Sequence, residues 1–600
     1  MNSFQGNYRR LNTVTGWLLF AVSTAVYTAT LEPTVSFWDC GEFILSAFRL
    51  QVGHPPGAPL FVMIGRVATM FALGDTSKVA FMMNMLSAVS SGFAIMFLYL
   101  TITHLSAKIF IKVKDPGAEH IPAIIGSGII GALAYTFSDT FWFSAVEGEL
   151  YALSSLVTGL VFWGMLKWEE EADEPYSARW IILVAFIMGL GLGIHRLNLL
   201  VIPVLVFVFY FRKYEITRTG LLKAFLGSVI LLYLMVFVLI PGVPKVAGWF
   251  ELLLVNVFGL PYNSGVLLFA AVLAALLVAG IRYSISRGRV ILNFALTVIA
   301  VIMIGYSSYA MIMIRSSARP PMNQNNPSDI FSLSYYINME QYGSAPKLFG
   351  HYYSAPVIDS KNVIAGYNKM DGRYKPYYRP EYTYDPSFET VFPRMYSSDP
   401  DHQTAYEYWG RIRGRKYTVS TAAGNETIVC PTFGENLRYF FRYQVGFMYL
   451  RYFMWNFAGR QNDIQGNGNP LHGNWISGIN FIDEARLGDL DNIPSDLKTN
   501  PGKNRYFFIP LMLGLAGLLW QYNRDRKGFW LVTAFFVMTG VAIIFYLNQY
   551  PNQPRERDYA YAGSFYAFAI WIGLGFMYVY EQVLRFMKEK SAAALVFVVL

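Results

Sequence analysis

The stretch FWDCGEFILSAFRLQVGHPPGAPL, residues 37–60, directly follows the first long apolar segment of the chain. A helix that begins at Trp38 gathers four polar residues into one stripe, because residues three or four apart share a helix face. These residues are Asp39, Glu42, Ser46 and Arg49. The opposite face is apolar enough to lie half-sunk in a bilayer surface. Pro55 and Pro56 end this helix, since each removes a backbone donor and fixes φ.

Two carboxylates one helical turn apart, with His54 and Arg49 close by, indicate chemistry at the point where the chain leaves the membrane. The same spacing also fits a capped surface helix whose charges are simply solvated. Spacing alone does not separate these two interpretations.

The composition describes an integral membrane protein, because 54% of the 600 residues are hydrophobic and only 14% are charged. The net charge of +9 is compatible with nucleic-acid binding, but the basic residues fall mainly in short loops between apolar runs. That distribution is the positive-inside pattern, so we interpret the charge as topology and expect no nucleic-acid partner. Cys40 and Cys430 form no metal-ligand motif, and two free thiols are favoured over a disulfide.

Apolar segments of roughly 20 residues, the length that crosses a bilayer, recur along the chain. They predict a mainly α fold, a polytopic transmembrane helix bundle of about 12–13 spans. The first segment, 13–31, is too long for a signal-peptide core and is expected to be a retained anchor. A short apolar run at 592–600 predicts that the membrane region continues beyond the chain end. The other segments are 80–105, 121–140, 150–167, 180–195, 197–211, 221–241, 265–281, 290–314, 505–520, 529–547 and 563–582.

A further apolar segment, 59–73, is interrupted by Arg66, and we interpret it as a second interfacial helix. With the N-terminus inside, this choice leaves most Lys and Arg residues in inside loops. If residues 59–73 crossed the membrane, every later loop would change sides, and the excess of Lys and Arg in the inside loops would be lost. The predicted regions are a transmembrane part at 1–314 with a catalytic outer loop at 32–79, an extracytoplasmic Tyr-rich insert at 315–504, and a second transmembrane part at 505–600.

The insert is too long to be a loop without structure of its own, so a small domain or a lid is expected. Its tyrosines either stack on a sugar or a peptide, because Tyr joins an apolar face to a polar tip, or pack the domain itself. Packing is the favoured interpretation for most of Tyr374, Tyr377, Tyr378, Tyr382 and Tyr384.

Several basic residues lie on the outer side, against the charge bias, where segments emerge from the membrane. They are Arg196 beside His195, Arg315 and Arg319, and Arg555 and Arg557 beside Asp558. Arginine suits phosphate because its fork donates two hydrogen bonds and stays charged. Snorkelling to headgroups explains any single one of them, but the group predicts a lipid-phosphate pocket. In the short loop before 150, Glu147 is a candidate for positioning a ligand, whereas Glu149 suits the first turn of the next helix.

Residues 39–60 resemble the GT-C glycosyltransferases, and more closely a protein O-mannosyltransferase-like branch with the pattern GDSGE…HPPGYPL. Trp38 and Cys40 stand where that pattern has Gly and Ser. The stretches RYFMWNFAGRQNDIQG (451–466) and PRERDYAYAG (554–563) are similar to bacterial members of the same branch. The matching residues of the first motif are Asp39, Gly41, Glu42, His54, Pro55, Pro56, Gly57, Pro59 and Leu60.

The resemblance implies transfer of a mannose-like sugar, with inversion, from a polyprenyl-phosphate donor to Ser or Thr of an exported protein. It also implies a site on the periplasmic side of a bacterial inner membrane and no cofactor, with a divalent metal left open. Asp39 then suits the general base and Glu42 an orienting role. Cations hold the leaving phosphate, and we assign His54, Arg196, Arg315, Arg555 and Arg557 to it. Candidates for other substrate contacts are Arg49, Glu147, His195, Arg319 and Asp558.

Two other functions compete with this transferase. An oligosaccharide or polysaccharide ligase of similar architecture transfers a preassembled glycan, and the motif at 39–60 does not separate it from a single-sugar transferase. A lipid-linked sugar transporter or flippase ranks last. Transporters place ionisable groups near the bilayer midplane, often in paired halves, whereas here they cluster at outer helix ends.

Overall fold

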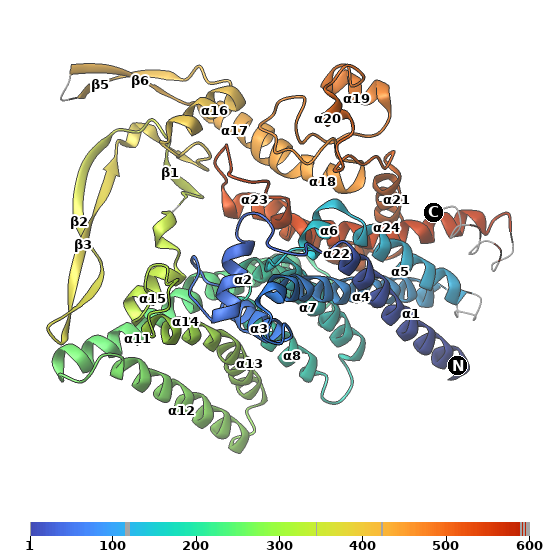
Figure 1. Cartoon of the computed structure of the whole chain (residues 1–600). Coiled ribbons are helices and arrows are strands. Elements are labelled where there is room, and N and C mark those ends of the chain that lie inside the picture. Colours follow the sequence, from blue (N-terminus) through green and yellow to red (C-terminus); the bar gives the residue numbers. More distant parts are fainter. Residues whose placement is uncertain are drawn as a thin grey trace.

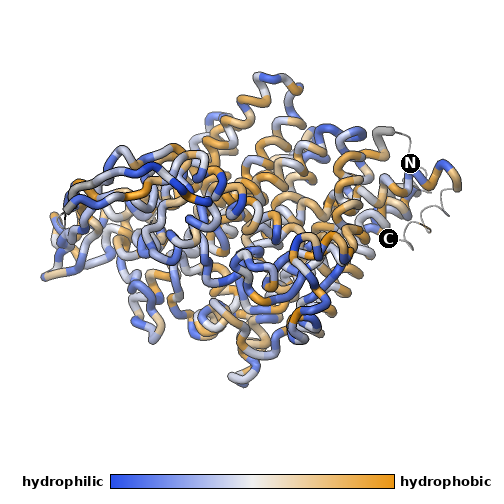
Figure 2. The backbone as a smooth tube through the Cα atoms, turned by 90° about the horizontal axis from the view of Figure 1, so that it is seen from above, coloured by the Kyte–Doolittle hydropathy of each residue, from blue (hydrophilic) through white to orange (hydrophobic). Residues whose placement is uncertain are grey.

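The computed structural model describes residues 2–113, 120–343, 345–421, 424–587, 591 and 595. Helices dominate, and a segment of hairpins and short helices lies along one side of the helical bundle (Figure 1). Figure 2 shows hydrophobic positions concentrated on the helices and hydrophilic ones in loops and the hairpin segment. The predicted polytopic helical fold is confirmed.

The centre of the bundle is α24 (Ala562–Val583), which is buried along most of its length. It packs against α4, α5, α21 and α22. Glycine permits the closest of these approaches, because a Cβ on Gly517 would lie 1.9 Å from the carbonyl oxygen of Trp571. These neighbouring helices are α4 (Val79–Val113), α5 (Ile121–Thr136), α21 (Ile509–Arg524) and α22 (Arg526–Met538), which α23 (Val541–Leu547) continues.

A second group of helices continues the bundle. In it, α8 and α13 cross in contact, since a Cβ on Gly305 would meet the backbone of Gly189 at 2.2 Å. Helix α12 lies at the rim of the molecule and exposes apolar side chains, as a lipid-facing helix does (Figure 1). The group comprises α7 (Tyr151–Glu171), α8 (Ala178–Leu192), α9 (Ile202–Lys213), α10 (Arg218–Tyr233), α11 (Ile240–Leu252), α12 (Ser264–Ser286), α13 (Val290–Tyr306) and α14 (Ala310–Ser317).

Among the described residues, six helices are long and apolar enough to cross a membrane. A seventh crossing results if α5 and α6 (Asp139–Ala145), bent by 71°, count as one broken span. This number is below the predicted 12–13 because several predicted segments, including α8, α9 and α21, are helices of 12 to 16 residues. A straight crossing needs about 20. Most of the run 592–600 lies outside the described residues.

The side segment contains three two-stranded antiparallel sheets. The longest is the hairpin of β2 (Val357–Met370) and β3 (Arg373–Tyr384). The turn end of this hairpin is fixed by Tyr374, whose hydroxyl donates to the buried carboxylate of Glu251 on α11 at 3.0 Å. The other strands are β1 (Phe349–His351), β4 (Glu389–Val391), β5 (Arg415–Thr421) and β6 (Gly424–Cys430).

The predicted packing role of the tyrosines holds for Tyr374, which is buried, and for Tyr384, which stacks on His351. Tyr377, Tyr378 and Tyr382 are exposed. The helices of this segment are α15 (Ile330–Ile337), α16 (Pro400–Gly410), α17 (Phe433–Tyr439), α18 (Arg451–Phe457), α19 (Asn480–Leu487) and α20 (Ser495–Lys498), with a π-helical stretch at Phe440–Leu450.

The N-terminal part supplies α1 (Asn2–Ala29) and two short helices, α2 (Cys40–Arg49) and α3 (Pro59–Met70). Helix α3 has 12 residues, too few to cross a bilayer. Arg66, the charge that interrupts it, donates to the carbonyl of Phe48 at 2.6 Å and so joins α3 to α2. This geometry favours an interfacial α3, as the charge bias predicts.

The topology has a direct test in two exposed loop residues. We expect a cysteine at Leu73, which is 91% exposed after α3, to react with a membrane-impermeant maleimide from outside. A cysteine at Tyr176, between α7 and α8, should react only after permeabilisation, because the charge bias predicts that these loops lie on opposite sides. The unsubstituted chain is the control, since Cys40 and Cys430 are buried and free. Reaction of both positions from one side contradicts the topology.

Candidate active site

Arg555 joins three distant segments of the chain. Its Nη1 donates to Glu149 Oε1 at 2.7 Å, and its Nη2 donates to Asp39 Oδ2 at 3.1 Å and to the hydroxyl of Tyr151 at 3.2 Å. The guanidinium carbon lies 4.7 Å from the ring centroid of Tyr559. Glu149 is completely buried, whereas the side chain of Asp39 is 41% exposed. Asp39 is therefore the carboxylate of this group that an incoming molecule reaches.

The charge of Arg555 is held by its surroundings. Burial by itself lowers the pKa of its guanidinium, but Tyr559 and Glu149 raise it well above its usual range. Burial raises the pKa of Glu149, and Arg555 opposes that shift. Each member of this buried pair therefore stabilises the charged form of the other.

Glu42 holds His54. Its Oε1 accepts hydrogen bonds from the backbone nitrogen of His54 at 2.6 Å and pairs with its Nδ1 at 2.7 Å, and its Oε2 accepts from Gln324 at 3.0 Å. A Cβ on Gly53 would lie 2.3 Å from Glu42 Oε1, so the loop requires glycine there. Both carboxylate oxygens are occupied, and Nε2 is the ring nitrogen of His54 left for another partner.

The same pair shifts two pKa values in opposite directions. Burial favours a neutral His54, but the hydrogen bond and charge of Glu42, and then the charges of Asp39 and Glu149, raise the pKa of His54 above its usual value. Burial likewise raises the pKa of Glu42, but hydrogen bonds and charge from His54 lower it overall. The contact with Glu42 thus favours the protonated, positively charged form of His54.

Glu147 lies beside Glu149, in a cluster that also includes Cys40. Its Oε2 accepts from Ser36 at 3.1 Å and from the Cys40 thiol at 3.6 Å. Burial, and then the charge of Glu149, raises the pKa of Glu147 to about 8. Ligand atoms of Cys40, Glu147 and Glu149 lie within 4.8 Å of one another, a spacing that could hold a divalent cation. Without one, a pKa of about 8 favours the protonated form of Glu147 at neutral pH, and that form does not act as a base.

The stretches 451–466 and 554–563 contact each other. Glu556 accepts from Arg451 and from Tyr452, each at 2.6 Å. Arg460 pairs with Asp139 at 2.7 Å. Arg557 is half-buried and its Nε donates to Gln553 at 3.2 Å. The segment 451–466 therefore fixes the loop that presents Arg555.

Other predicted site residues lie elsewhere. Arg315 donates to the carbonyl of Leu50 at 2.7 Å, at the opposite end of α2 from Asp39, roughly 15 Å away at the rise of an α-helix. Arg196 donates to the carbonyl of Ile337 on α15. Arg49 and Arg319 are exposed. Asp558 begins the 3₁₀ turn before α24, near Thr140 and Arg460.

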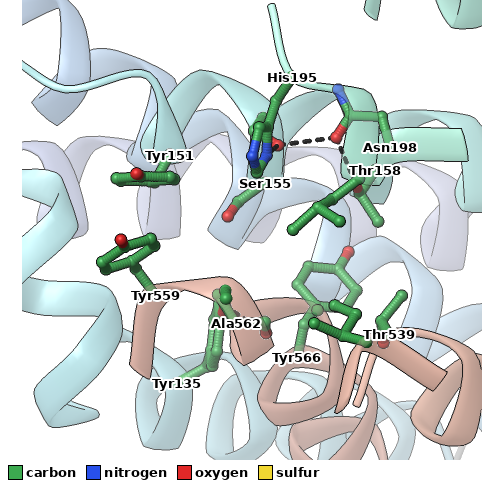
Figure 3. A pocket seen from close by; sticks show the side chains of 15 residues that line it. Tyr135, Tyr151, Ser155, Thr158, His195, Asn198, Thr539, Tyr559, Ala562 and Tyr566 are labelled. Atoms are coloured by element: carbon green, nitrogen blue, oxygen red, sulfur yellow. Dashed lines mark hydrogen bonds between the residues drawn. The ribbon is translucent and has the colours of Figure 1, made fainter. Parts of the chain in front are cut away.

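His195 lines a small cavity inside the bundle, of about 40 Å³. Tyr151 and Tyr559, stacked with centroids 4.0 Å apart, line this cavity (Figure 3). Both also contact Arg555. Ser154 donates a hydrogen bond to Asn198 Oδ1 at 2.7 Å, and these two residues make one wall of the cavity polar. A space of this size suits a few water molecules. Other lining residues are Tyr135, Ser155, Thr158, Thr539 and Tyr566.

The sequence does not single out Tyr151 and Tyr559, and it predicts Glu149 at the first turn of the next helix without a cation as partner. The available signal was two carboxylates two residues apart in a short apolar-flanked loop, where one charge has to find a cation. Nothing local identifies that cation as Arg555, which is 406 residues away.

The ion pair predicts a stability effect. Replacing Arg555 by Gln leaves Glu149 buried without its partner, and we expect the free energy of unfolding in detergent to fall by about 3–5 kcal/mol. Adding Glu149→Gln should recover much of that loss, since no buried charge remains. Arg557→Gln is the matched control and should cost less, because its partners are neutral. Equal losses for both arginines contradict the assignment.

Comparisons with known proteins agree with the first motif. Residues 39–218 match the model of the "Protein O-mannosyl-transferase TMEM260 N-terminal domain", and residues 343–441 match a family of unknown function. The chain is 31% identical over 198 residues to "Protein O-mannosyl-transferase tmem260" of Dictyostelium discoideum, which is 31% of this chain and 22% of that protein. It is 27% identical over 209 residues to the Mus musculus protein of the same name, 34% of this chain and 27% of the relative.

No solved structure matches the chain. The similarity to the two relatives spans about a quarter of each. The residues that the family model matches, 39–218, include Asp39, Glu42, His54, Glu147 and Glu149, but not Arg555. The N-terminal third of this chain is therefore similar to the N-terminal domain of the protein O-mannosyl-transferases.

Proposed function

We propose that this chain is a membrane glycosyltransferase of the GT-C type that transfers mannose from a polyprenyl-phosphate donor to Ser or Thr of an exported protein, with inversion. The observation that supports it most is a half-exposed carboxylate, Asp39, held by a buried arginine where α1 gives way to α2. The names of the similar proteins support the sugar and the protein acceptor.

Asp39 is the general base in this proposal. The acceptor oxygen attacks the anomeric carbon while its proton passes to Asp39, and the bond from that carbon to the donor phosphate breaks. Glu147 is protonated at neutral pH, and Glu149 and Glu42 are engaged by Arg555 and His54. Asp39 is the carboxylate of this set with room for an acceptor hydroxyl.

His54, Arg557 and Arg555 provide the positive charge for the leaving phosphate. Negative charge grows on that phosphate in the transition state, and fixed cations stabilise it. His54 and Arg557 are only partly buried and reach the ligand, whereas Arg555 is largely occupied by Glu149 and Tyr151 and holds Asp39 in place. Glu42 acts through His54 by fixing its orientation.

The positive-inside pattern places this site on the non-cytoplasmic side, in a bacterial host the periplasmic face of the inner membrane. A donor sugar presented by its lipid at that surface, and an acceptor protein arriving after export, both reach Asp39 from there. The segment 315–504 is then an extracytoplasmic insert beside the site.

The roles of the two motif carboxylates are separable. We expect Asp39→Asn to lower single-turnover mannose transfer by about 10²–10⁴-fold, the usual effect of a lost general base, while donor binding persists. Glu42→Gln should cost less and should weaken donor binding, because His54 loses its support. The assay measures transfer by the purified variants to an acceptor peptide. The mass added to the peptide also separates the two functions, because a transferase adds one hexose and a ligase adds a whole glycan. Near-normal transfer by the Asn variant contradicts the mechanism.

The His54–Glu42 pair predicts a pH dependence. Because the pKa of His54 is raised above 6.5, its positive charge persists to higher pH than that of a free imidazole and is lost as pH rises through the raised pKa. Donor affinity should therefore fall on the alkaline side with one titration. In Glu42→Gln the midpoint should move to lower pH, since Glu42 is the main cause of the raised pKa. A midpoint unchanged between the two proteins would falsify the assignment of this limb to His54.

A further inference from the structure

Two cations lie close together outside the candidate active site. Arg394, in the loop after β4, is only 1% exposed, and its Nη2 donates to the backbone carbonyl of Lys347 at 2.9 Å. Its Nε and Nη1 are buried and have no hydrogen-bond partner in the described part of the chain. No described carboxylate lies within ion-pair distance of Arg394 or of Lys347.

Aromatic rings only partly compensate this burial. The guanidinium carbon lies 3.7 Å from the ring centroid of Phe392 and 5.8 Å from those of Phe440 and Phe545. Cation–π contacts are weaker than the cost of removing an ion from water, and buried charges in proteins are normally paired. Burial lowers the pKa of Arg394 to about 10, and burial and then Arg394 lower the pKa of Lys347. Among the residues that the structure describes, neither cation has an anionic partner.

A buried asparagine holds the loop that carries Lys347 and the loop that carries Arg394 at fixed positions. Asn548 Nδ2 donates to the carbonyls of Pro346 at 2.6 Å and Pro393 at 2.9 Å, the residues just before the two cations. The backbone nitrogen of Arg394 donates to Asn436 at 2.9 Å. Two separate loops are thus held at fixed positions beside the end of α23.

The site lies at the membrane boundary. Lys347 Nζ is 4.0 Å from the ring centroid of Tyr546, in the last turn of a helix pair, Arg526–Leu547, that is long and apolar enough to cross a membrane. Large apolar side chains around the cations are exposed, and we name them the apolar rim: Leu348, Phe349, Val391, Phe441 and Phe545. An exposed apolar rim around a positive centre is the chemistry of a lipid headgroup site.

We propose that Lys347 and Arg394 bind the phosphate of a membrane lipid, with the apolar rim against its hydrocarbon chains. Lys347 is half-exposed and contacts the phosphate, and Arg394 adds its charge from beneath. Two cations without a carboxylate match a phosphate monoester, which carries close to two negative charges, better than a diester, which carries one. This inference stands apart from the transfer reaction. The polyprenyl phosphate that the proposed transfer reaction releases is also a lipid phosphate monoester.

Native mass spectrometry of the full chain in neutral detergent tests the site with three probes: a phosphatidic acid, a phosphatidylglycerol and inorganic phosphate. We expect tightest binding of phosphatidic acid, and a loss of about tenfold in Lys347→Gln, since a charge-assisted contact is removed. Lys361→Gln, on exposed strand β2, is the matched control and should bind as the unsubstituted chain does.

Two further variants separate the parts of the site. Leu348→Ser with Phe349→Ser should weaken phosphatidic acid binding and leave binding of inorganic phosphate unchanged. Arg394→Gln should act like Lys347→Gln, and where it fails to fold, the Lys347 variant decides. Unchanged phosphatidic acid binding in Lys347→Gln overturns the site. If inorganic phosphate binds as tightly as phosphatidic acid, the claim that the ligand is a lipid is wrong. If phosphatidylglycerol binds as tightly as phosphatidic acid, the claim that the site prefers a phosphate monoester is wrong. None of these outcomes depends on transfer activity.

Discussion

The buried pair of Arg555 and Glu149 is the interaction on which the candidate site depends. An unpaired ion in an apolar interior is costly, so the loop before α24 has to lie on the loop before α7. That contact brings the second guanidinium nitrogen to Asp39 at the start of α2. Three segments separated by hundreds of residues are thereby fixed around one half-exposed carboxylate.

The four consecutive charges at 555–558 each take a different partner. Arg555 binds Glu149, Glu556 binds Arg451, Arg557 binds the side chains of Gln553 and Tyr559, and Asp558 lies by Thr140. Because opposite charges alternate, neighbouring side chains do not repel one another. The side chains of Arg555, Glu556 and Asp558 lie against other segments, and that of Arg557 stays within its own loop. This pattern explains why the stretches 451–466 and 554–563 occur in the same chain: one supports the other.

The comparisons and the structure describe complementary halves of the site. Similarity to the protein O-mannosyl-transferases covers 39–218, which holds Asp39, Glu42 and His54. Arg555 and its supporting segment come from the C-terminal part, beyond that match. A chemical account of the site therefore needs both parts, and the tertiary structure is what joins them.

The sequence by itself determined the helical membrane fold and the local motif, because hydropathy and helix periodicity act over one or two turns. It also found Arg555 and Arg557 as charges out of place. Only the tertiary structure decided that Glu149 is the partner of Arg555, that Glu42 holds His54, and that Arg315 closes the far end of α2. These pairings depend on how helices pack across hundreds of residues, and residue spacing along the chain holds no record of that.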